Sequence, residues 1–300
     1  MTFARIMRPR VSQPKKNRTI ADLVPPQSYP PVSLLFVPAH KPRAIEKARA
    51  LACDMVILDL EDAVPEDAKD TARANAVAAV KQEFPGKRVA VRINTARGTM
   101  FKPGVQEHDI EAFDDDARPD FLVLPKVETP TDILHTGVFK SVPLLAMIET
   151  PAGVLDARFI AAAERVEGLI AGFNDLAYCL GLPDPDDRSA LAYARQAIVI
   201  AARASNVWCF DGVFNAIDDG EGFLADARDG HRLGFDGKTL IHPGQIEPCN
   251  AIWQPDEAQL ERARALVAAH AGGAVRHGDR MIENMHVEAA ERLLTRKRDR

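Results

Sequence analysis

The chain has 300 residues, of which 46% are hydrophobic and 27% charged, a size that suits one α/β barrel of typically about 250 residues better than several domains. Its net charge is −5, and six basic residues lie within residues 1–20, so the rest of the chain carries −11 (−5 less 6). This acidic remainder argues against nucleic-acid binding, because phosphate neutralisation needs clustered Lys and Arg. No apolar run approaches the roughly 20 residues that cross a bilayer, so we predict no membrane segment.

Residues 1–30 form a basic, proline-ended segment that we interpret as a flexible tail. Because residues 1–20 contain arginines and no acid, a transit peptide within residues 1–25 for an organellar matrix is the alternative, although lysines and scarce serines are untypical of one. No apolar stretch of the secretory type is present. We therefore expect a cytoplasmic location, with an organellar matrix as the alternative.

Eight short apolar runs alternate with segments rich in Ala, Leu, Arg and Glu, which are good helix formers. The runs are continuous, as in parallel strands covered on both faces, and eight repeats favour a closed (β/α)8 TIM barrel over residues 31–250. A doubly wound open sheet usually has fewer strands, and no GxGxxG follows the first run. The predicted strands are Ser33–Val37, Met55–Leu60, Val89–Ile93, Phe121–Leu124, Leu144–Ile148, Gly168–Ala171, Trp208–Val213 and Lys238–Ile241. The predicted helices include Arg43–Ala52, Glu66–Phe84, Val154–Val166 and Arg188–Ser205.

A C-terminal helical extension is predicted over residues 251–300. Pro255 and Asp256 are a plausible cap for a helix over Glu257–Ala271, and a glycine-containing link leads to a second helix over Asp279–Leu294. The four cysteines show no CxxC spacing, and we expect buried free thiols of a reducing compartment: Cys53, Cys179, Cys209 and Cys249.

Seven of the eight predicted strands are followed directly by charged or amide side chains. Barrel active sites are assembled at the C-terminal ends of the strands, so we expect these groups to converge on one mouth. They include Asp59, Glu61, Asp62, Arg92, Asn94, Lys126, Glu128, Glu149, Asn174, Asp175, Asn215 and His242.

Six motifs in order resemble the citrate lyase β-subunit-like family, which includes malyl-CoA and citramalyl-CoA lyases within the aldolase/citrate lyase superfamily. They are SLLFVPA over Ser33–Ala39, DLED over Asp59–Asp62, VRIN over Val91–Asn94, LPK over Leu124–Lys126, IETP over Ile148–Pro151, and GFDGK over Gly234–Lys238 followed by IHP over Ile241–Pro243. The resemblance runs from about Ser33 to about Leu294.

The resemblance implies a TIM-barrel enzyme that cleaves or condenses a β-hydroxyacyl-CoA, giving an acyl-CoA and a 2-oxo acid. It implies Mg2+, replaceable by Mn2+, on Glu149 and Asp175, and a substrate carboxylate on Arg92, with Glu149 also facing the substrate. Coenzyme A would lie near Phe36, Arg43, Lys47, Ile241 and His242. The resemblance further implies a homo-oligomer, a trimer or hexamer, whose C-terminal extension packs on a neighbouring subunit.

Two departures from the family pattern stand out. Val32-Ser33 replaces the common Arg-Ser before the first strand, which removes one basic group. The C-terminal Met-Ile-Asp-x-Pro motif reads Met281-Ile282-Glu283-Asn284-Met285, so glutamate replaces the aspartate that reaches a neighbour's active site. Glu283 keeps the carboxylate on an arm one methylene longer.

The residue types suit this chemistry. Mg2+ prefers oxygen ligands and usually takes only one or two protein carboxylates, which leaves positions for water and a chelating 2-oxo acid. Arg92 offers a planar fork for a carboxylate. Residues around the metal ligands would orient them or their waters: Glu61, Asp62, Lys126 and Asn174. Glu283 is the candidate to protonate the departing enolate.

Each candidate also has a structural alternative. Glu149 could be a helix N-terminal acid, Asp175 the N-cap of a helix that starts at Leu176, and Arg92 an ion-pair partner of Asp59 or Glu61. For Lys126 an electrostatic or packing role is preferred. His242 could simply turn the chain before Pro243, and Glu283 could be an ordinary exposed residue.

Three rival functions are compatible with the sequence. The first is a Schiff-base aldolase with Lys126 as nucleophile. The second is a citryl lyase subunit that acts on an acyl-carrier-protein thioester, and the third is an inactive binding or scaffold protein. The acyl group, the 2-oxo acid and a thioesterase step after cleavage all stay open.

Overall fold

The computed structural model describes residues 30–95, 105–113, 116–134, 136, 142–269, 275–277 and 280–295. The basic leader lies outside these residues apart from Pro30, and with it the tail and transit-peptide interpretations. None of the described helices has the length and apolar character that a membrane crossing requires.

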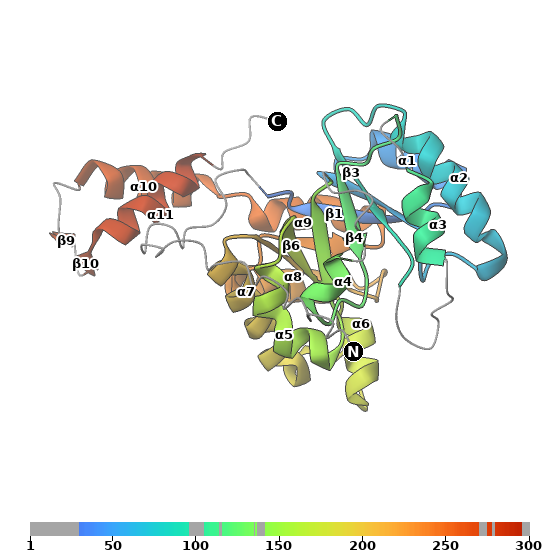
Figure 1. Cartoon of the computed structure of the whole chain (residues 1–300). Helices are drawn as coiled ribbons and strands as arrows, with labels where there is room; N and C mark the ends of the chain where they lie inside the picture. Colours follow the sequence, from blue (N-terminus) through green and yellow to red (C-terminus); the bar gives the residue numbers. More distant parts are fainter. Residues whose placement is uncertain are drawn as a thin grey trace, which may run out of the picture.

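Eight parallel strands close into a barrel in chain order, with β1 paired to β8 (Figure 1). The strands are β1 (Ser33–Pro38), β2 (Met55–Asp59), β3 (Arg88–Arg92), β4 (Phe121–Leu124), β5 (Leu144–Ile148), β6 (Val166–Ala171), β7 (Trp208–Asp211) and β8 (Gly237–Leu240). Each coincides with a predicted apolar run to within about two residues at either end, as expected for boundaries set by hydrogen bonding. The predicted TIM barrel is confirmed.

Helices connect the strands and cover the barrel from outside. They are α1 (Pro42–Ala50), η2 (Glu66–Ala68), α2 (Lys69–Val80), α3 (Val105–Glu111), α4 (Pro130–Leu134), α5 (Pro151–Ala161), α6 (Phe173–Leu180), η4 (Arg188–Leu191), α7 (Ala192–Ser205), α8 (Gly220–Leu233), η5 (Pro243–Gln245) and α9 (Ile246–Trp253). The η elements are 3-10 helices.

Two apolar layers explain why the strand sequences are continuous rather than alternating. On β2, Met55 and Ile57 face the barrel interior, whereas Val56 and Leu58 face the covering helices. The interior layer is filled by large side chains, among them Phe121, Trp208 and Phe210, so the barrel is a packed core and not a pore. Both layers remove apolar surface from water, which leaves the strand ends as the place for polar chemistry.

The C-terminal arm, residues 257–295, corrects one prediction. Helix α10 (Glu257–Ala269) and helix α11 (Asn284–Thr295) pack on each other and extend to one side of the barrel (Figure 1). The start of the predicted helix 279–294 is wrong, because Arg280–Ile282 forms strand β10, antiparallel to β9 (Val275–His277). A hairpin partner satisfies these backbone groups, and α11 begins only after Glu283.

The cysteines are free, as predicted, but not all are buried. Cys53, Cys209 and Cys249 lie in the core, and burial raises the pKa of Cys249 to about 12. Cys179 is exposed on α6, so its predicted burial is wrong. The short α6 turns only part of its surface to the core, through Phe173, Leu176 and Ala177, and residue 179 falls on the solvent side.

Candidate active site

Carboxylates from three strand ends meet around the Lys126 ammonium at the mouth of the barrel. Lys126 Nζ lies 2.9 Å from Glu61 Oε1, 3.5 Å from Asp62 Oδ2 and 3.6 Å from Asp175 Oδ1. The backbone N–H of Lys126 donates to Glu149 Oε1 at 2.7 Å. The predicted convergence of these strand-end groups is therefore present, and we call Glu61, Asp62, Glu149 and Asp175 the carboxylate cluster.

Local backbone geometry holds Glu149 in place. Lys126 has φ of 52°, in the left-handed region, where its N–H is turned toward the neighbouring strand end. Gly172 lies against the other side of the carboxylate, because a Cβ there would overlap Glu149 Oε2. Thr150 caps α5 by accepting from Gly153 N at 3.0 Å, with Pro151 at the first helical position, so capping falls to the neighbour and not to Glu149.

Asp175 lies in the first turn of α6, where an acid is favourable near the helix N-terminus. The alternative that Asp175 is an N-cap is wrong, because α6 starts at Phe173 and Gly172 occupies the cap position. Asn174, beside Asp175, does not face the carboxylate cluster in its described contacts. Its amide pairs reciprocally with Asn215, at 3.1 and 3.0 Å.

The electrostatics of the carboxylate cluster favour added positive charge. Glu149 is only 1% exposed; burial and the nearby charge of Glu61 raise its pKa to about 8. Burial also raises the pKa of Glu61 to about 7, although Arg92 and Lys126 oppose it. Glu61 Oε2 is buried and accepts no hydrogen bond of good geometry, although Arg92 Nη1 lies 3.1 Å away. One lysine and one arginine therefore do not fully neutralise these carboxylates.

Lys126 is held as an ammonium. Burial lowers the pKa of its amine, but the charges of Glu61 and Glu149 and the hydrogen bond to Glu61 outweigh burial, so the pKa is raised above its ordinary value. A Schiff-base nucleophile needs the opposite shift, toward a neutral amine.

Most of the donor groups of the Arg92 guanidinium are already bonded to other residues of the chain. Its Nε and Nη2 donate to Asp59 at 2.7 and 2.6 Å, and its Nη1 lies 3.1 Å from Glu61 Oε2. The guanidinium also stacks over the Phe36 ring, 4.8 Å from its centroid. The structural alternative, an ion pair with Asp59 and Glu61, is thus present, and Nη1 alone lies among the carboxylates of Glu61 and Asp62.

The sequence placed Asp59 among the strand-end groups but gave it no role in the site beyond a possible ion pair with Arg92. Asp59 is fully buried and accepts from Arg92 and from the backbone N–H groups of Glu61 and Ala63. Burial raises its pKa, but Arg92 outweighs this and the pKa is lowered. The available signal was a carboxylate that closes a fully apolar run, where an unpaired charge would be costly.

The residues predicted to contact coenzyme A lie at the ends of β1 and β8. Arg43 and Lys47 are exposed on α1, four residues apart and hence on one face, and Phe36 is half-buried. Ile241 and His242 are exposed directly after β8. His242 Nδ1 accepts from Gly244 N at 3.1 Å, which caps η5, so the predicted turn at Pro243 is also present.

Glu283 is not brought to the carboxylate cluster within one chain. It is exposed at the base of α11, where its backbone N–H donates to His286 Nδ1 at 3.0 Å. None of the described barrel elements packs extensively against α10 or α11. A role in catalysis therefore requires the arm of another copy.

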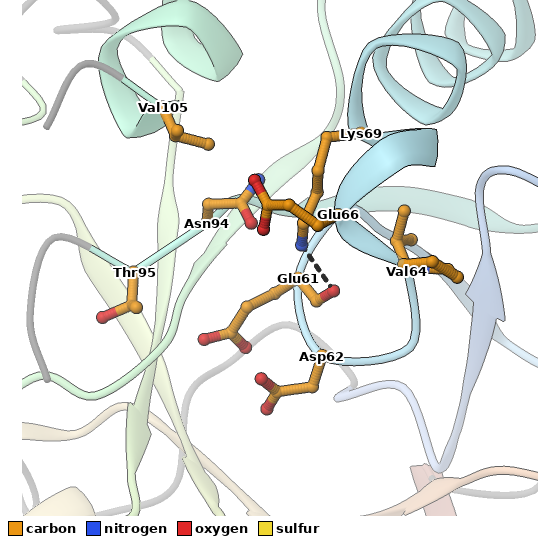
Figure 2. Close-up of a pocket in the computed structure, with 9 residues that line it drawn as sticks. Glu61, Asp62, Val64, Glu66, Lys69, Asn94, Thr95 and Val105 are labelled. Carbon is orange, nitrogen blue, oxygen red and sulfur yellow. Dashed lines mark hydrogen bonds between the residues drawn. The ribbon is translucent and has the colours of Figure 1, made fainter. Parts of the chain in front are cut away.

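A cavity of about 240 Å³ adjoins the carboxylate cluster on the side of β2 and β3 (Figure 2). It shares Glu61 and Asp62 with the cluster but does not include Glu149 or Asp175. Figure 2 shows the Lys69 amine reaching the backbone of the loop after β2. There it donates to the carbonyls of Leu60 and Glu61 at 2.7 Å each. Lys69 thus braces the loop that carries Glu61 and Asp62.

Within the described part of the chain, no three His, Cys, Asp or Glu side chains form a cage for a metal ion. This does not conflict with a magnesium site, because Mg2+ commonly takes one or two carboxylates and keeps water on its other positions. The oxygen donors, the raised pKa of Glu149 and the close fit of Gly172 match such a site.

The sequence model of the HpcH/HpaI aldolase/citrate lyase family matches residues 32–243. A (3S)-malyl-CoA thioesterase of Cereibacter sphaeroides is 39% identical over 278 residues, which cover 90% of this chain and 95% of that protein. The citrate lyase subunit beta of Leuconostoc mesenteroides subsp. cremoris is 32% identical, over 87% of this chain and 91% of that protein.

Among solved structures, the chain is similar to the protein CitE of Mycobacterium tuberculosis in complex with magnesium, acetoacetate and coenzyme A. The TM-score is 0.77 at 32% identity, and the match covers 89% of this chain and 97% of that one. The M. tuberculosis citrate lyase beta subunit complexed with oxaloacetate and magnesium matches with a TM-score of 0.65 at 33% identity, over 74% of this chain and 96% of that one.

Proposed function

The chain belongs to the HpcH/HpaI aldolase/citrate lyase family, a family of carbon–carbon lyases, and we propose that it cleaves a β-hydroxyacyl-CoA such as malyl-CoA or citramalyl-CoA. The products would be an acyl-CoA and a 2-oxo acid. The observation that carries the proposal is a buried carboxylate, Glu149, held beside Asp175 at the barrel mouth with a pKa raised to about 8.

Glu149 and Asp175 would hold Mg2+, which Mn2+ could replace. A bound divalent cation would supply Lewis-acid polarisation of the carbonyl oxygen of the 2-oxo acid. The similarity to solved complexes that contain magnesium with acetoacetate or oxaloacetate supports this assignment. Glu149 directly follows β5, and Asp175 lies in the first turn of α6, so both carboxylates are attached to regular elements of the barrel.

The other residues of the mouth orient these ligands and the substrate. Lys126 holds Glu149 through its backbone N–H and Glu61 through its ammonium. Arg92, fixed by Asp59 and Phe36, would present Nη1 to the carboxylate of the 2-oxo acid. Glu61 and Asp62 would position water at the metal.

Coenzyme A would lie along Phe36, Arg43, Lys47, Ile241 and His242. The exposed cations on α1 suit its phosphates, and the exposed side chain of Ile241 suits an apolar part of the thioester arm. We further propose a homo-oligomer, a trimer or hexamer, in which the arm of one subunit brings Glu283 to the mouth of the next. In the cleavage direction, that carboxyl group would protonate the acyl-CoA carbon that loses its bond.

The test of the proposal is product analysis with malyl-CoA, citramalyl-CoA and citryl-CoA in the presence of Mg2+. We expect acetyl-CoA and glyoxylate from malyl-CoA, and loss of activity with EDTA. Glu149→Gln should abolish cleavage and weaken Mg2+ binding measured by calorimetry. Glu167→Gln is the matched control, because Glu167 is exposed on β6, away from the carboxylate cluster. Cleavage that persists in EDTA and in Glu149→Gln would reject the proposal.

Hydrolysis of the thioester is the second candidate, and the 39% identity to a (3S)-malyl-CoA thioesterase favours it. Hydrolysis of malyl-CoA consumes water and gives malate and free coenzyme A, whereas lysis gives acetyl-CoA and glyoxylate. The same assay separates them. Malate with free coenzyme A, and no acetyl-CoA at any time point, would assign hydrolysis instead of lysis.

The similarity to a citrate lyase subunit supports testing the alternative that the substrate is a thioester on an acyl carrier protein. Turnover of free coenzyme A thioesters by the purified chain would exclude strict dependence on an acyl carrier protein. The Schiff-base alternative predicts borohydride trapping of pyruvate on Lys126, which the ammonium state of that side chain disfavours.

A further inference from the structure

We propose that Gln245 is a positioning residue for the thioester end of the active site, a role that rests on the proposed coenzyme A binding. Gln245 lies in the 3-10 helix η5, behind Ile241 and His242, and its side chain is buried, with the residue 4% exposed. It touches no reacting group. Its function is to fix the two backbone segments that follow β7 and β8.

The side-chain amide of Gln245 makes hydrogen bonds to both segments. Gln245 Oε1 accepts from the backbone N–H groups of Ile241 and His242, at 3.1 and 3.3 Å. Its Nε2 donates to the carbonyl of Phe214, at 3.0 Å. The side chain thus bridges the end of β8 and the segment that follows β7, which are 27 or more residues apart in sequence.

The Ile241–His242 segment needs such a support. Ile241 is 40% exposed and His242 is exposed, so core packing does not fix their side chains. Their backbone position then depends on hydrogen bonds, and Gln245 accepts from both N–H groups. If the thioester arm binds here, a shift of this backbone moves its binding surface.

The segment after β7 is held at three successive carbonyls by three different elements. Lys238 Nζ donates to Gly212 O at 2.6 Å, and Arg188 Nη2 donates to Val213 O at 2.5 Å. Gln245 provides the third bond, to Phe214 O, and it is the neutral member of the set. The next residue, Asn215, pairs with Asn174 beside Asp175, so this segment borders the carboxylate cluster.

The position requires an acceptor and a donor on one short arm, which is what an amide offers. Gln245→Met has similar length and volume but makes neither bond. Gln245→Glu keeps the acceptor for Ile241 and His242 and loses the donor to Phe214. These two variants separate the contribution of the two sides.

Asn250→Leu is the matched control. Asn250 is also buried, on α9, and its Nδ2 donates to the carbonyl of Ala52 at 3.0 Å. Ala52 precedes β2, so this bond lies at the opposite end of the barrel from the mouth. The control removes a buried amide at similar structural cost but leaves the segments that follow β7 and β8 unchanged.

The experiment measures binding of free coenzyme A by calorimetry, Mg2+ affinity, and hydrogen exchange at the Ile241 and His242 amides. We expect Gln245→Met to weaken coenzyme A binding by about tenfold, the loss of roughly one net hydrogen bond, and to speed exchange at both amides. Gln245→Glu should restore part of the affinity. Mg2+ affinity should stay within about twofold of wild type, because the metal carboxylates are held by other residues.

The outcomes separate the two proposals. Wild-type protein that does not bind coenzyme A contradicts the proposed function, whereas the exchange rates still test the role of Gln245. Unchanged exchange at Ile241 and His242 in Gln245→Met overturns the positioning role. So does an equal loss of coenzyme A binding in Asn250→Leu, since that would mark a general effect of destabilisation. If Gln245→Met fails to fold, Gln245→Asn carries the same two readouts, because its side chain is one methylene too short to reach both strand ends.

Discussion

The carboxylate of Glu149 is placed by the backbone of two neighbours, Lys126 and Gly172. The left-handed backbone of Lys126 points an N–H at Oε1, and Gly172 leaves room for Oε2 on the other side. The backbone of Gly172 has φ of −107°, which other residues adopt readily. Glycine is therefore required there for space and not for conformation.

Gly172→Ala should weaken Mg2+ binding while preserving the fold. The added methyl group would push Glu149 out of its position, and displaced ligands typically cost 10- to 100-fold in metal affinity, so we expect a loss of about that size. Overpacking should cost about 1–3 kcal/mol of stability. Calorimetric titration with Mg2+ and thermal unfolding measure the two effects.

Gly220→Ala is the control, because a Cβ at Gly220 meets nothing within 4 Å. Wild-type Mg2+ affinity in Gly172→Ala would show that Glu149 does not bind the metal from its described position.

Mg2+ affinity should rise with pH and level off above about pH 8. Burial and Glu61 raise the pKa of Glu149 to about 8 from an ordinary value of 4.5, so the metal-free carboxyl keeps its proton at neutral pH. Metal binding must displace that proton, and affinity should fall nearly tenfold for each unit below pH 8, as for one released proton. Titrations in buffers of different ionisation heat count the protons released.

The same shift lowers the stability of the metal-free protein as pH rises. A raised pKa favours folding while the carboxyl is protonated; that contribution is full below about pH 4.5 and is lost as pH rises through 8. Glu149→Gln should flatten both pH dependences. An affinity that does not change between pH 6 and 8 would contradict the raised pKa.

At the scale of elements, the packing of α7 and α8 on β7 and β8 includes a buried charge cluster in an otherwise apolar layer. Lys238 is fully buried, and its Nζ lies 2.7 Å from Asp211 and 2.6 Å from Asp226. The same ammonium bonds the carbonyl of Gly212 at the barrel mouth. Asp226 lies on α8, so this contact ties the helix to the strand ends.

Lys238→Met should destabilise the protein strongly. Removing the ammonium leaves two buried aspartates without their main partner, a loss that typically costs about 3–5 kcal/mol. Urea unfolding of the metal-free protein measures it. Arg232→Met is the control, because the exposed pair of Arg232 with Asp229 should contribute less than about 1 kcal/mol. Equal stability losses in the two variants would contradict a structural role for the buried pair.

The sequence predicted the barrel strands correctly because they are buried on both faces, but it missed the short hairpin in the arm. The strand sequences are apolar on both faces because both the interior and the helix layer exclude water. Arg280–Ile282 has no such pattern, and its helical prediction failed because a three-residue partner, Val275–His277, supplies the backbone hydrogen bonds. Helix periodicity over short segments does not detect this pairing.

At the scale of the whole molecule, the arm is separate from the barrel that it follows. Helices α10 and α11 bury Leu260, Ala263, Val287 and Ala290, largely against each other, and extend beside the barrel (Figure 1). Glu283 at the base of α11 is exposed. A hairpin of helices that carries a carboxylate away from its own barrel is suited to serve a second copy.

Co-expression of Glu149→Gln with Glu283→Ala should restore activity that each variant lacks alone. If the arm of one subunit serves the next, a competent site combines the intact mouth of one chain with the intact arm of another. Random mixing in a cyclic oligomer gives about one quarter of wild-type activity in the whole mixture, and an isolated mixed trimer has about one competent site in three. Differential tags isolate the mixed oligomer for the lyase assay, and its native mass gives the subunit number.

Mixed oligomers with no more activity than the single variants would show that Glu283 acts within its own chain or not at all. Full activity of Glu283→Ala alone would remove this residue from the mechanism.

The sequence by itself determined the barrel, its eight strands and the identity of the mouth residues. These follow from continuous apolar runs and from the rule that parallel strands place their C-terminal ends together. Hence Glu61, Asp62, Lys126, Glu149 and Asp175 were predicted to meet, and they do.

Only the tertiary structure decided how those groups share their charges and hydrogen bonds. Asp59 takes most of the Arg92 fork, Asn174 turns to Asn215, and Gln245 bridges the ends of two strands. Such partners are set by distances between elements far apart in sequence, which no local pattern encodes. The raised pKa of Glu149 has the same origin, because it arises from burial and from a neighbouring carboxylate that the fold brings close.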